Sequence, residues 1–365
     1  FHPPTLRESS PLGPLAFPPL PHQHDVISQL VHHFRGSEKP ELGYMRGSEA
    51  VLQAGCGDGK TFVFLAVAAQ LGGPVMVCVH TSRLVEQWVA AVRKTLPEAR
   101  VGVLKAAKKP KPTDNFVVAS IQTLVARAEP HVFDGYSLVG IDEAHHVPAE
   151  TFAAVVSTIP CARLALSATP KGRADGLESL LFWLCGNMYH MQGPRVVADV
   201  RVYKYAPTTR QAGTPITTRT RRKLSREPAR NVLIGDIVRR EAESGHCVLV
   251  LTDFIDHARE LADALPGSGI MCGKLQRDTD ARVLFASYAF SSEGVDLQRV
   301  SCLVMAMPCH HNVEQVLGRI RTAVGPRLPP LVIDIRDMPL FSRFKYARLD
   351  AFYAERNWRV LADDN

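Results

Sequence analysis

The sequence predicts an α/β protein of two tandem domains, each a mostly parallel sheet with helices on both faces. Short, wholly apolar runs alternate with longer segments of helical periodicity, which is typical of strands buried on both faces by helices. A strongly basic stretch interrupts this alternation near residues 195–229, after which the alternation resumes. The length of 365 residues is enough for two domains of ordinary size, each with its own core.

The first half of the chain shows the alternation clearly. A Pro-rich lead-in over residues 1–21 has little periodicity and is expected to be irregular. Apolar residues then recur at helical spacing, and a polar loop separates this helix from the first strand. The expected helices cover 26–34, 62–71, 82–96 and 121–126, and the expected strands cover 50–52, 75–79, 116–119, 138–141 and 164–166.

The second half repeats this construction. We assign residues 1–194 to a first domain, 195–229 to a basic linker or junction, and 230–365 to a second domain. The junction contains many Arg and Lys residues but only two acidic residues, Asp199 and Glu227. Its positive charge could follow a phosphate backbone, or the segment could be a solvated connector. Beyond it, the expected helices cover 232–241, 258–265, 313–320 and 341–358, and the expected strands cover 248–251, 282–285, 300–305 and 331–335.

Composition favours a polyanionic partner and a reducing compartment. The net charge is +7, from 43 basic and 36 acidic residues, as in many proteins that bind nucleic acid. The eight cysteines lack C-x-x-C spacing and mostly lie in apolar runs, so we expect free buried thiols. Cys309-His310-His311 is interpreted as a loop in preference to a metal site. Because no apolar run approaches the ~20 residues of a membrane span, we expect an intracellular protein, cytoplasmic or nuclear.

The segment Gly55-Cys56-Gly57-Asp58-Gly59-Lys60-Thr61 lies between the first expected strand and an apolar helix. Glycines let backbone N–H groups surround phosphate oxygens, and the helix N-terminus adds positive charge. We therefore predict that this loop binds ATP, with Lys60 on the β/γ-phosphates and Thr61 on Mg²⁺. The usual pattern has glycine where this chain has Ala54, and a flexible turn with a chance lysine is the alternative.

Asp142 and Glu143 directly follow the expected strand 138–141. Hydrolysis of a phosphoanhydride requires a carboxylate on Mg²⁺ and a group that orients the attacking water. Asp142 suits the first role and Glu143 the second, because successive residues leaving a strand point to different sides. The alternative is an ordinary pair of surface charges.

These segments and Ser167-Ala168-Thr169 resemble motifs I, II and III of superfamily 2 helicases with a DEAH box. The resemblance is closest to helicases of the xeroderma-pigmentosum-B type and to those of large viruses and phages, and it extends over residues 20–358. Further motifs occur in the same order. Residues 80–88 resemble motif Ia, and residues 120–123 resemble motif Ic. The start of the second core domain is resembled by residues 230–234 and 250–252, motif V by 291–296, and motif VI by 315–320.

The resemblance implies two RecA-like domains with ATP in the cleft between them. Gln23 would recognise adenine, and Arg319 would reach the phosphates as an arginine finger. The nucleotide contacts would be completed by Gly55, Gly57, Asp58, Gly59, Glu293, Gly294 and Asp296. Coupling of ATP state to domain motion would fall to His145, Ser167, Thr169 and Gln315. The nucleic-acid backbone would lie along Thr81, Arg83, Ser120, Thr123 and Thr252, for which capping or turn roles are the alternative.

The sequence therefore predicts an ATP- and Mg²⁺-dependent helicase or translocase, with DNA favoured over RNA as the partner, working as a monomer. Two positions depart from the family pattern: Thr322 stands where motif VI has a second arginine, and Pro21-His22 where an arginine precedes Gln23. The Thr322 departure leaves open a weakly hydrolysing, ATP-switched nucleic-acid clamp. A motor subunit of a nuclease or remodelling complex is a third possibility. The compact build suggests a viral or phage source.

Overall fold

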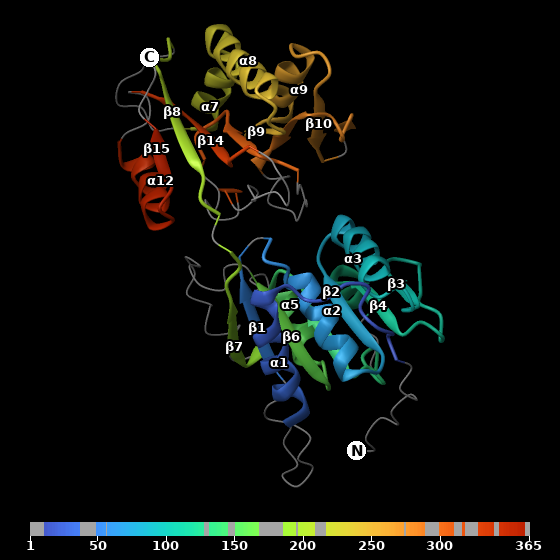
Figure 1. The fold of residues 1–365 in the computed structure, drawn as a ribbon. Coiled ribbons are helices and arrows are strands. Elements are labelled where there is room, and N and C mark those ends of the chain that lie inside the picture. The colour runs from blue at the N-terminus through green and yellow to red at the C-terminus, as the bar shows by residue number, and fades with distance from the viewer. Residues whose placement is uncertain are drawn as a thin grey trace. The chain divides into compact units, whose positions relative to one another are not determined.

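The computed structural model describes residues 11–36, 49–55, 57–127, 131–144, 150–167, 185–194, 196–208, 217–273, 275–288, 299–309, 316–317, 328–338 and 343–361, without the side chains of 150–152 and 343–345. The chain divides into two compact units, Phe1–Pro194 and Arg195–Asn365. Each unit has its own sheet with helices packed on it (Figure 1). In the described ranges, no helix is both long and apolar enough to cross a membrane.

The first unit is built on a sheet in which every described strand pair is parallel. The strand order is β3-β4-β2-β5-β6-β1-β7. The inner strands are almost wholly buried, as expected where helices cover both faces. The bounds are β1 (Glu49–Ala54), β2 (Val75–Val79), β3 (Val101–Leu104), β4 (Phe116–Ser120), β5 (Leu138–Ile141), β6 (Ala162–Ser167) and β7 (Asn187–Met191).

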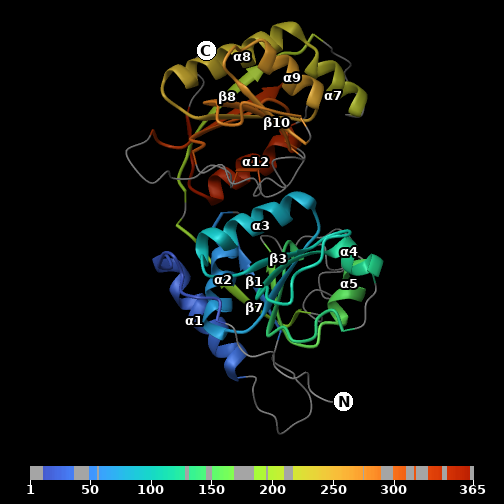
Figure 2. The same cartoon turned by 90° about the vertical axis from the view of Figure 1, so that its right-hand side faces the viewer.

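Helices cover both faces of this sheet (Figure 2). On one face lie α1 (Pro21–Gly36), α2 (Lys60–Leu71) and α3 (Ser82–Thr95). On the other lie α4 (Ile121–Arg127) and α5 (Glu150–Ser157). Side chains along β1 alternate between the two cores: Ala50 and Leu52 enter the first, and Val51 the second.

The second unit has a sheet of order β11-β10-β12-β9-β13-β14-β8-β15, in which β11 is antiparallel to β10 and the other described pairs are parallel. One face packs on α8 (Pro228–Glu243) and α9 (Ile255–Asp263). Residues of α7 (Thr218–Ser225) and α12 (Arg343–Glu355) enter the core of the other face. The strands are β8 (Asp199–Tyr205), β9 (Val248–Thr252), β10 (Gly269–Cys272), β11 (Leu275–Arg277), β12 (Val283–Ser287), β13 (Cys302–Met305), β14 (Leu331–Asp337) and β15 (Arg359–Leu361).

The stretch expected to be a basic linker, 195–229, contributes β8 and α7 to the second unit. β8 pairs with β14 along its whole length, so this segment is part of the second sheet. Several of its basic side chains form ion pairs inside that unit. These pairs are Arg201–Glu241, Arg221–Asp253, Arg222–Asp256 and Arg226–Asp256.

Candidate nucleotide site

The Gly-rich loop connects the end of β1 to the first residue of α2. Gly57 and Gly59 have φ angles of 89° and 91°, in the left-handed region that favours glycine. A Cβ on Gly59 would lie 2.4 Å from Gln23 Nε2, so a larger residue there would displace the Gln23 side chain from its contact with the loop. The loop is closed by Asp58, whose amide donates to the Gly55 carbonyl (3.2 Å) and whose carboxylate accepts from the Gly55 amide (2.9 Å).

Lys60 begins α2 and points its ammonium group back into this loop. Its Nζ donates to the carbonyls of Ala54 (2.9 Å) and Gly55 (3.1 Å). Gly59 has no side chain to cap α2, and the amides of the first helical turn are unsatisfied donors in any helix. The loop thus combines backbone donors, a helix N-terminus and an ammonium group, which is the chemistry of a phosphate site.

Gln23 of α1 lies against the loop and is almost completely buried. Its Nε2 donates to the Asp58 carbonyl (3.2 Å), and its Oε1 accepts from the Leu20 amide (2.9 Å). His22 Nε2 lies 3.4 Å from the same Asp58 carbonyl. These contacts join the N-terminal segment to the phosphate loop, and adenine recognition by Gln23 stays a prediction.

Asp142 and Glu143 directly follow β5. The Asp142 carboxylate, only 8% exposed, accepts from Trp88 Nε1 (2.8 Å) and from the Glu143 amide (2.9 Å). Glu143 has a φ of 51°, which turns the chain sharply after Asp142. From the sequence, Trp88 is expected in the helix 82–96 and in the segment that resembles motif Ia, with no polar partner predicted for it. Because the indole N–H of a buried tryptophan usually has a hydrogen-bond acceptor, a polar partner for Trp88 could have been predicted.

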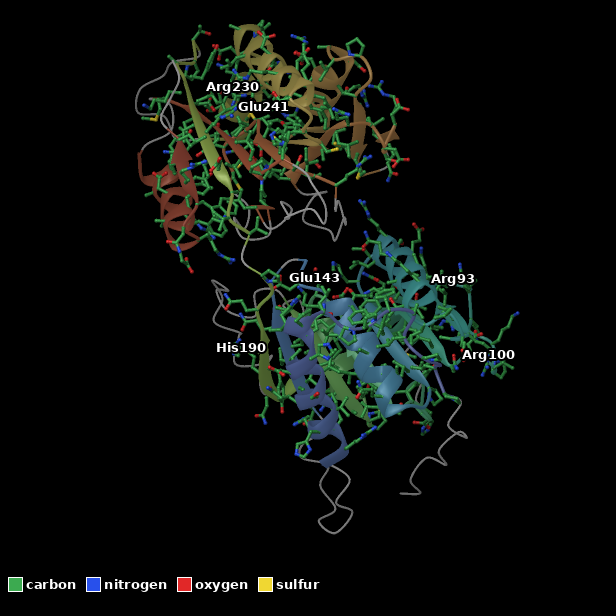
Figure 3. The ribbon with its side chains drawn as sticks, viewed as in Figure 1. Arg93, Arg100, Glu143, His190, Arg230 and Glu241 are labelled. Carbon is green, nitrogen blue, oxygen red and sulfur yellow. The ribbon has the colours of Figure 1, made fainter. Side chains whose placement is uncertain are left out.

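The loop, the acidic pair and Ser167 meet at one edge of the sheet. β5, β6 and β1 are adjacent and parallel, and these groups follow their carboxyl ends. Two strand spacings separate β1 from β5, or roughly 10 Å. Figure 3 shows Glu143 at this edge of the first unit. Ser167 ends β6 fully buried, and its Oγ has no hydrogen-bond partner among the described residues. Ligands of parallel α/β sheets gather at such an edge.

Asp58 makes one contact that the sequence did not suggest. Its carboxylate accepts a hydrogen bond from the Gly193 amide (3.2 Å), and a Cβ on Gly193 would lie 2.5 Å from Asp58 Oδ1. Gly193 lies just before the second unit begins at Arg195. The phosphate loop therefore holds the last residues of the first unit.

The residues predicted to contact nucleic acid have structural hydrogen bonds. Thr81 caps α3 by accepting from the Leu84 amide (3.2 Å). Ser120 donates to Gln122 Oε1 (2.7 Å), and Thr123 accepts from the Ala106 amide (2.9 Å). Thr81, Ser120, Thr123 and the partly buried Arg83 follow the carboxyl ends of the neighbouring strands β2 and β4. Their contact with nucleic acid stays a prediction.

Thr252 ends β9 in the second unit and is fully buried. Its Oγ lies 2.6 Å from His257 Nδ1, and His257 Nε2 lies 3.1 Å from Asn231 Oδ1. Because the Asn231 amide nitrogen donates to Ser225 and Glu260, its oxygen must accept, so Nε2 of His257 carries a proton. Burial and, as a smaller effect, the positive charge of Arg230 together lower the pKa of His257 to about 3, so the ring is neutral near pH 7 and its Nδ1 accepts from the Thr252 hydroxyl.

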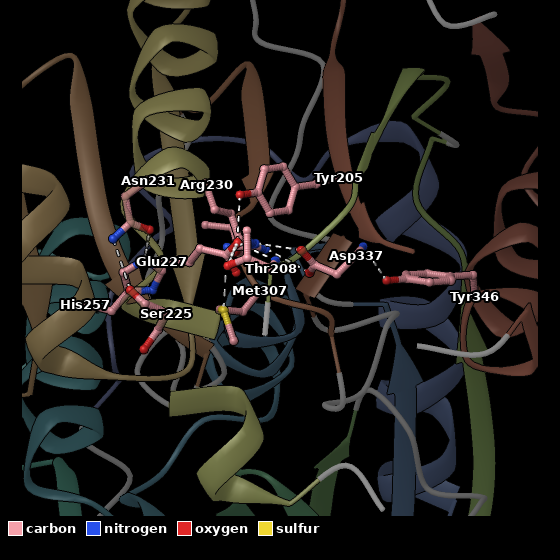
Figure 4. Close-up of polar contacts among 11 residues, drawn as sticks. Tyr205, Thr208, Ser225, Glu227, Arg230, Asn231, His257, Met307, Asp337 and Tyr346 are labelled. Atoms are coloured by element: carbon pink, nitrogen blue, oxygen red, sulfur yellow. Dashed lines mark hydrogen bonds and ion pairs between the residues drawn. The ribbon is translucent and has the colours of Figure 1, made fainter. Parts of the chain in front are cut away.

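Arg230 forms the centre of a buried cluster beside the hydrogen-bonded side chains of Asn231 and His257 (Figure 4). Its guanidinium binds both carboxylate oxygens of Asp337 (2.6 and 2.9 Å) and donates to the Ala306 carbonyl (2.7 Å). Burial raises the pKa of Asp337, and Arg230 opposes that shift. Glu227 accepts from the Tyr205 hydroxyl and from Thr208 nearby. The cluster joins the carboxyl ends of β8, β13 and β14.

Several predicted residues lie outside the described ranges. They are His145, Thr169, Glu293, Gly294, Asp296, Gln315, Arg319 and the position of the motif VI departure, Thr322. Within those ranges, no group of three or more His, Cys, Asp or Glu side chains could hold a metal ion.

Comparison with known proteins agrees with this geometry. A family described as "Type III restriction enzyme, res subunit" matches residues 16–172, which include the Gly-rich loop, the acidic pair and Ser167. A protein of Acanthamoeba polyphaga mimivirus, named for ATP-dependent RNA helicase activity, is 23% identical over 332 residues. A phage T5 protein named as a helicase is 28% identical over 303 residues. This chain is related to the superfamily 2 helicases of large viruses and phages.

The matches cover most of this chain but less of its relatives. They include 84% of this chain and 64% of the mimivirus protein, and 76% and 66% for the phage T5 protein. An African swine fever virus relative, also named for RNA helicase activity, is 24% identical, over 92% of this chain and 72% of its own. The chain thus spans about two thirds of the length of these helicases.

Solved structures confirm the predicted fold of two RecA-like cores. Saccharomyces cerevisiae Dbp5 bound to RNA and ADP BeF3 has a TM-score of 0.59 at 12% identity, over 96% of this chain and 94% of that one. The helicase domain of Pyrococcus furiosus Hef has a TM-score of 0.55 at 13% identity, over 92% and 97%. At such low identity, these likenesses show the fold alone.

Proposed function

We propose that this chain is an ATP- and Mg²⁺-dependent motor that moves along or unwinds nucleic acid. The observation that carries the proposal is the edge of the first sheet, where a phosphate loop and a carboxylate pair, the buried Asp142 and the partly buried Glu143, follow strands that are two positions apart. This is the minimum that phosphoanhydride hydrolysis requires: an anion site, a metal ligand and a group for the water. The relatives, named as helicases, support the same activity.

The residues of this edge have separate roles. Lys60 exchanges two neutral carbonyl partners for the β/γ-phosphates, which are stronger, charge-assisted acceptors. Thr61 and Asp142 supply the oxygen ligands that Mg²⁺ prefers, and the bond from Trp88 fixes the Asp142 carboxylate. Bound Mg²⁺ would neutralise charge on the phosphates. Glu143 orients the attacking water and accepts its proton.

The remaining assignments belong to the same proposal and rest on the motif resemblance. Gln23 recognises adenine, and Arg319 acts as the arginine finger. Glu293, Gly294 and Asp296 contact the nucleotide, while His145, Ser167, Thr169 and Gln315 couple hydrolysis to motion. Thr81, Arg83, Ser120, Thr123 and Thr252 lie along the nucleic-acid backbone. We expect a monomer that acts inside the cell on DNA in preference to RNA, although two relatives carry RNA helicase names.

The proposal is tested by steady-state ATP hydrolysis. The chain is assayed alone and with single-stranded DNA, duplex DNA and RNA, at low and moderate salt. Lys60→Ala and Glu143→Gln remove the phosphate contact and the group for the water, and both should abolish turnover. The controls Lys94→Ala and Glu86→Gln make the same charge changes at exposed positions of α3 and should leave turnover intact.

The outcomes separate the motor from the clamp. Stimulation by one polymer, lost in both active-site variants, supports the motor and identifies its track. ATP-dependent binding of nucleic acid that requires Lys60 but proceeds without turnover would refute the motor and favour the clamp. Equal hydrolysis by Glu143→Gln and the unmodified chain would contradict the role given to Glu143.

A further inference from the structure

A basic segment that no motif covers lies between β3 and β4 in the first unit. Lys105, Lys108 and Lys109 fall within five residues, directly after the last residue of β3. Two backbone hydrogen bonds between Lys105 and Lys108, of 2.9 and 3.1 Å, close the segment into a turn. We call residues 105–109 the lysine turn.

The lysine turn is held in place by α4. The Ala106 amide donates to Thr123 Oγ1 (2.9 Å), and the Arg127 guanidinium donates to the Ala106 carbonyl. Ala106 has a φ of 48°, a left-handed conformation that is uncommon for a residue other than glycine. Such a conformation persists when the surrounding structure fixes it, and residues held in uncommon backbone conformations cluster at functional sites. The turn is therefore a shaped surface and not a loose loop.

The charge of the lysine turn is not compensated. Lys108 and Lys109 are exposed, and in the part of the chain that the structure describes no ion pair involves Lys105, Lys108 or Lys109. The nearest acidic residue along the segment is Asp114, whose carboxylate accepts from the Lys111 amide. In the basic stretch 195–229, by contrast, Arg201, Arg221 and Arg222 are paired with carboxylates of the second unit, while Arg219 and Lys223 are exposed. The lysine turn differs from that stretch because none of its three lysines is paired with a carboxylate among the described residues.

The position of the turn points to a partner. β3, β4 and β2 are adjacent and parallel, with β3 at the margin of the sheet (Figure 1). The turn therefore lies on the same edge as Thr81, after β2, and as Ser120 and Thr123, after β4. Thr123 even bonds to the turn directly. A row of hydroxyl and ammonium groups along one edge suits the phosphates of a polynucleotide.

We propose that the lysine turn binds the phosphate backbone and extends the nucleic-acid track of the first unit to the β3 margin. This inference rests on the proposed function, because it assumes that the chain binds nucleic acid. The contact is independent of base sequence and depends strongly on salt, because each ammonium group on a phosphate releases counterions. It requires neither ATP nor the acidic pair.

The test measures the dissociation constant of a labelled oligonucleotide against salt concentration, by fluorescence anisotropy, for single-stranded DNA, duplex DNA and RNA. The variant is Lys108→Gln with Lys109→Gln, and the matched control is Arg222→Gln with Arg226→Gln in the basic stretch. Loss of two phosphate contacts should reduce the slope of log affinity against log salt by about 1.4–1.8 and weaken binding about 25- to 60-fold near 0.1 M salt. Lys108→Arg with Lys109→Arg should retain the slope, and ATP hydrolysis without nucleic acid should be unchanged in every variant.

The results distinguish this inference from the proposed function. An unchanged slope in the lysine variant, with normal binding by the unmodified chain, overturns the inference alone. An equal loss in the arginine control also overturns it, because the effect would then reflect total charge. Salt-dependent binding through the turn without ATP hydrolysis would support the inference and overturn the motor. No binding of any polynucleotide by the unmodified chain would overturn both.

Discussion

Replacing Arg230 by leucine should destabilise the second unit more than any surface change. Arg230 and Asp337 are both fully buried, and their paired bonds are 2.6 and 2.9 Å long. Removing one partner of a buried ion pair costs about 3–5 kcal/mol, because the other charge stays buried. The Ala306 carbonyl also loses its donor, which costs roughly 1 kcal/mol more. The total of roughly 4–6 kcal/mol is a large part of the 5–15 kcal/mol that stabilises a typical domain.

Arg359→Leu is the matched control for this change. Arg359 binds both oxygens of Asp199 at 2.9 and 2.7 Å, nearly the geometry of Arg230, but its side chain is 70% exposed. Its removal should leave the stability of the second unit almost unchanged, because solvent replaces the lost bonds. The two pairs share chemistry and geometry and differ in burial.

The assay is hydrogen exchange of the full chain in a urea series, read on peptides from β9, β13 and β14. Arg230→Leu should lower the urea midpoint of these peptides, while peptides from β2 and β5 of the first unit keep theirs. Arg230→Leu combined with Asp337→Leu should recover part of the loss, because no buried charge is left. Equal effects of Arg230→Leu and Arg359→Leu would refute the argument from burial, and so would a double variant as unstable as the single one.

Three further changes test the environment of single groups. His257 is neutral when folded, with a pKa of about 3 against 6.5 unfolded, so the stability it contributes is present above pH 6.5 and is lost as the pH falls toward 3. At pH 5 the loss should be about 2 kcal/mol, measured as the difference in urea stability between the unmodified chain and His257→Gln. Trp88→Phe keeps the ring but removes the donor to Asp142, and should raise the Mg²⁺ concentration for half-maximal ATP hydrolysis about 10-fold or more. Gly59→Ala should weaken ATP binding about 10-fold or more, because it adds left-handed strain and a clash with Gln23.

Each of these three predictions has a clear contrary result. An identical pH dependence in His257→Gln would show that another group titrates in that range. An unchanged Mg²⁺ dependence in the Trp88→Phe variant would contradict the idea that the Trp88 bond holds Asp142 in place for the metal. Gly72→Ala is the control for Gly59→Ala, since Gly72 has a φ of 74° but no atom within 4 Å of an added Cβ. Equal loss of ATP binding in both variants would contradict the view that the contact with Gln23 causes the loss in Gly59→Ala.

The inner strands of both sheets could mostly be predicted from the sequence, and the edge strands could not. Inner strands such as β2, β5 and β9 are buried on both faces and read as continuous apolar runs. The four edge strands, β3, β7, β11 and β15, were all missed. β7, β11 and β15 are short and partly exposed, so they contain polar residues and resemble loops. The inner strands β8 and β10 were missed as well; the mixed basic and apolar pattern of β8 resembles a linker.

The site was predictable to the extent that its chemistry is local in sequence. The Gly-rich loop and the acidic pair follow strands, and the order of a parallel sheet then brings them to one edge. The groups that hold them are distant in sequence: Trp88 lies 54 residues from Asp142, and Gly193 lies 135 residues from Asp58. No periodicity connects such pairs, since the contact depends on how the helices and the segment after β7 pack on the sheet.

The two basic segments show that the number of basic residues in a segment does not indicate whether their charges are paired. The stretch 195–229 is rich in arginine, whose planar fork pairs with two carboxylate oxygens and tolerates burial. Arg221, for instance, is a buried residue that binds Asp253 and the Pro308 carbonyl. The lysine turn carries compact ammonium groups, which are strongly hydrated and stay in solvent. Arg221 is thus held inside the second unit, whereas Lys108 and Lys109 stay exposed at the β3 margin of the first sheet, where the proposed phosphate contact would be made.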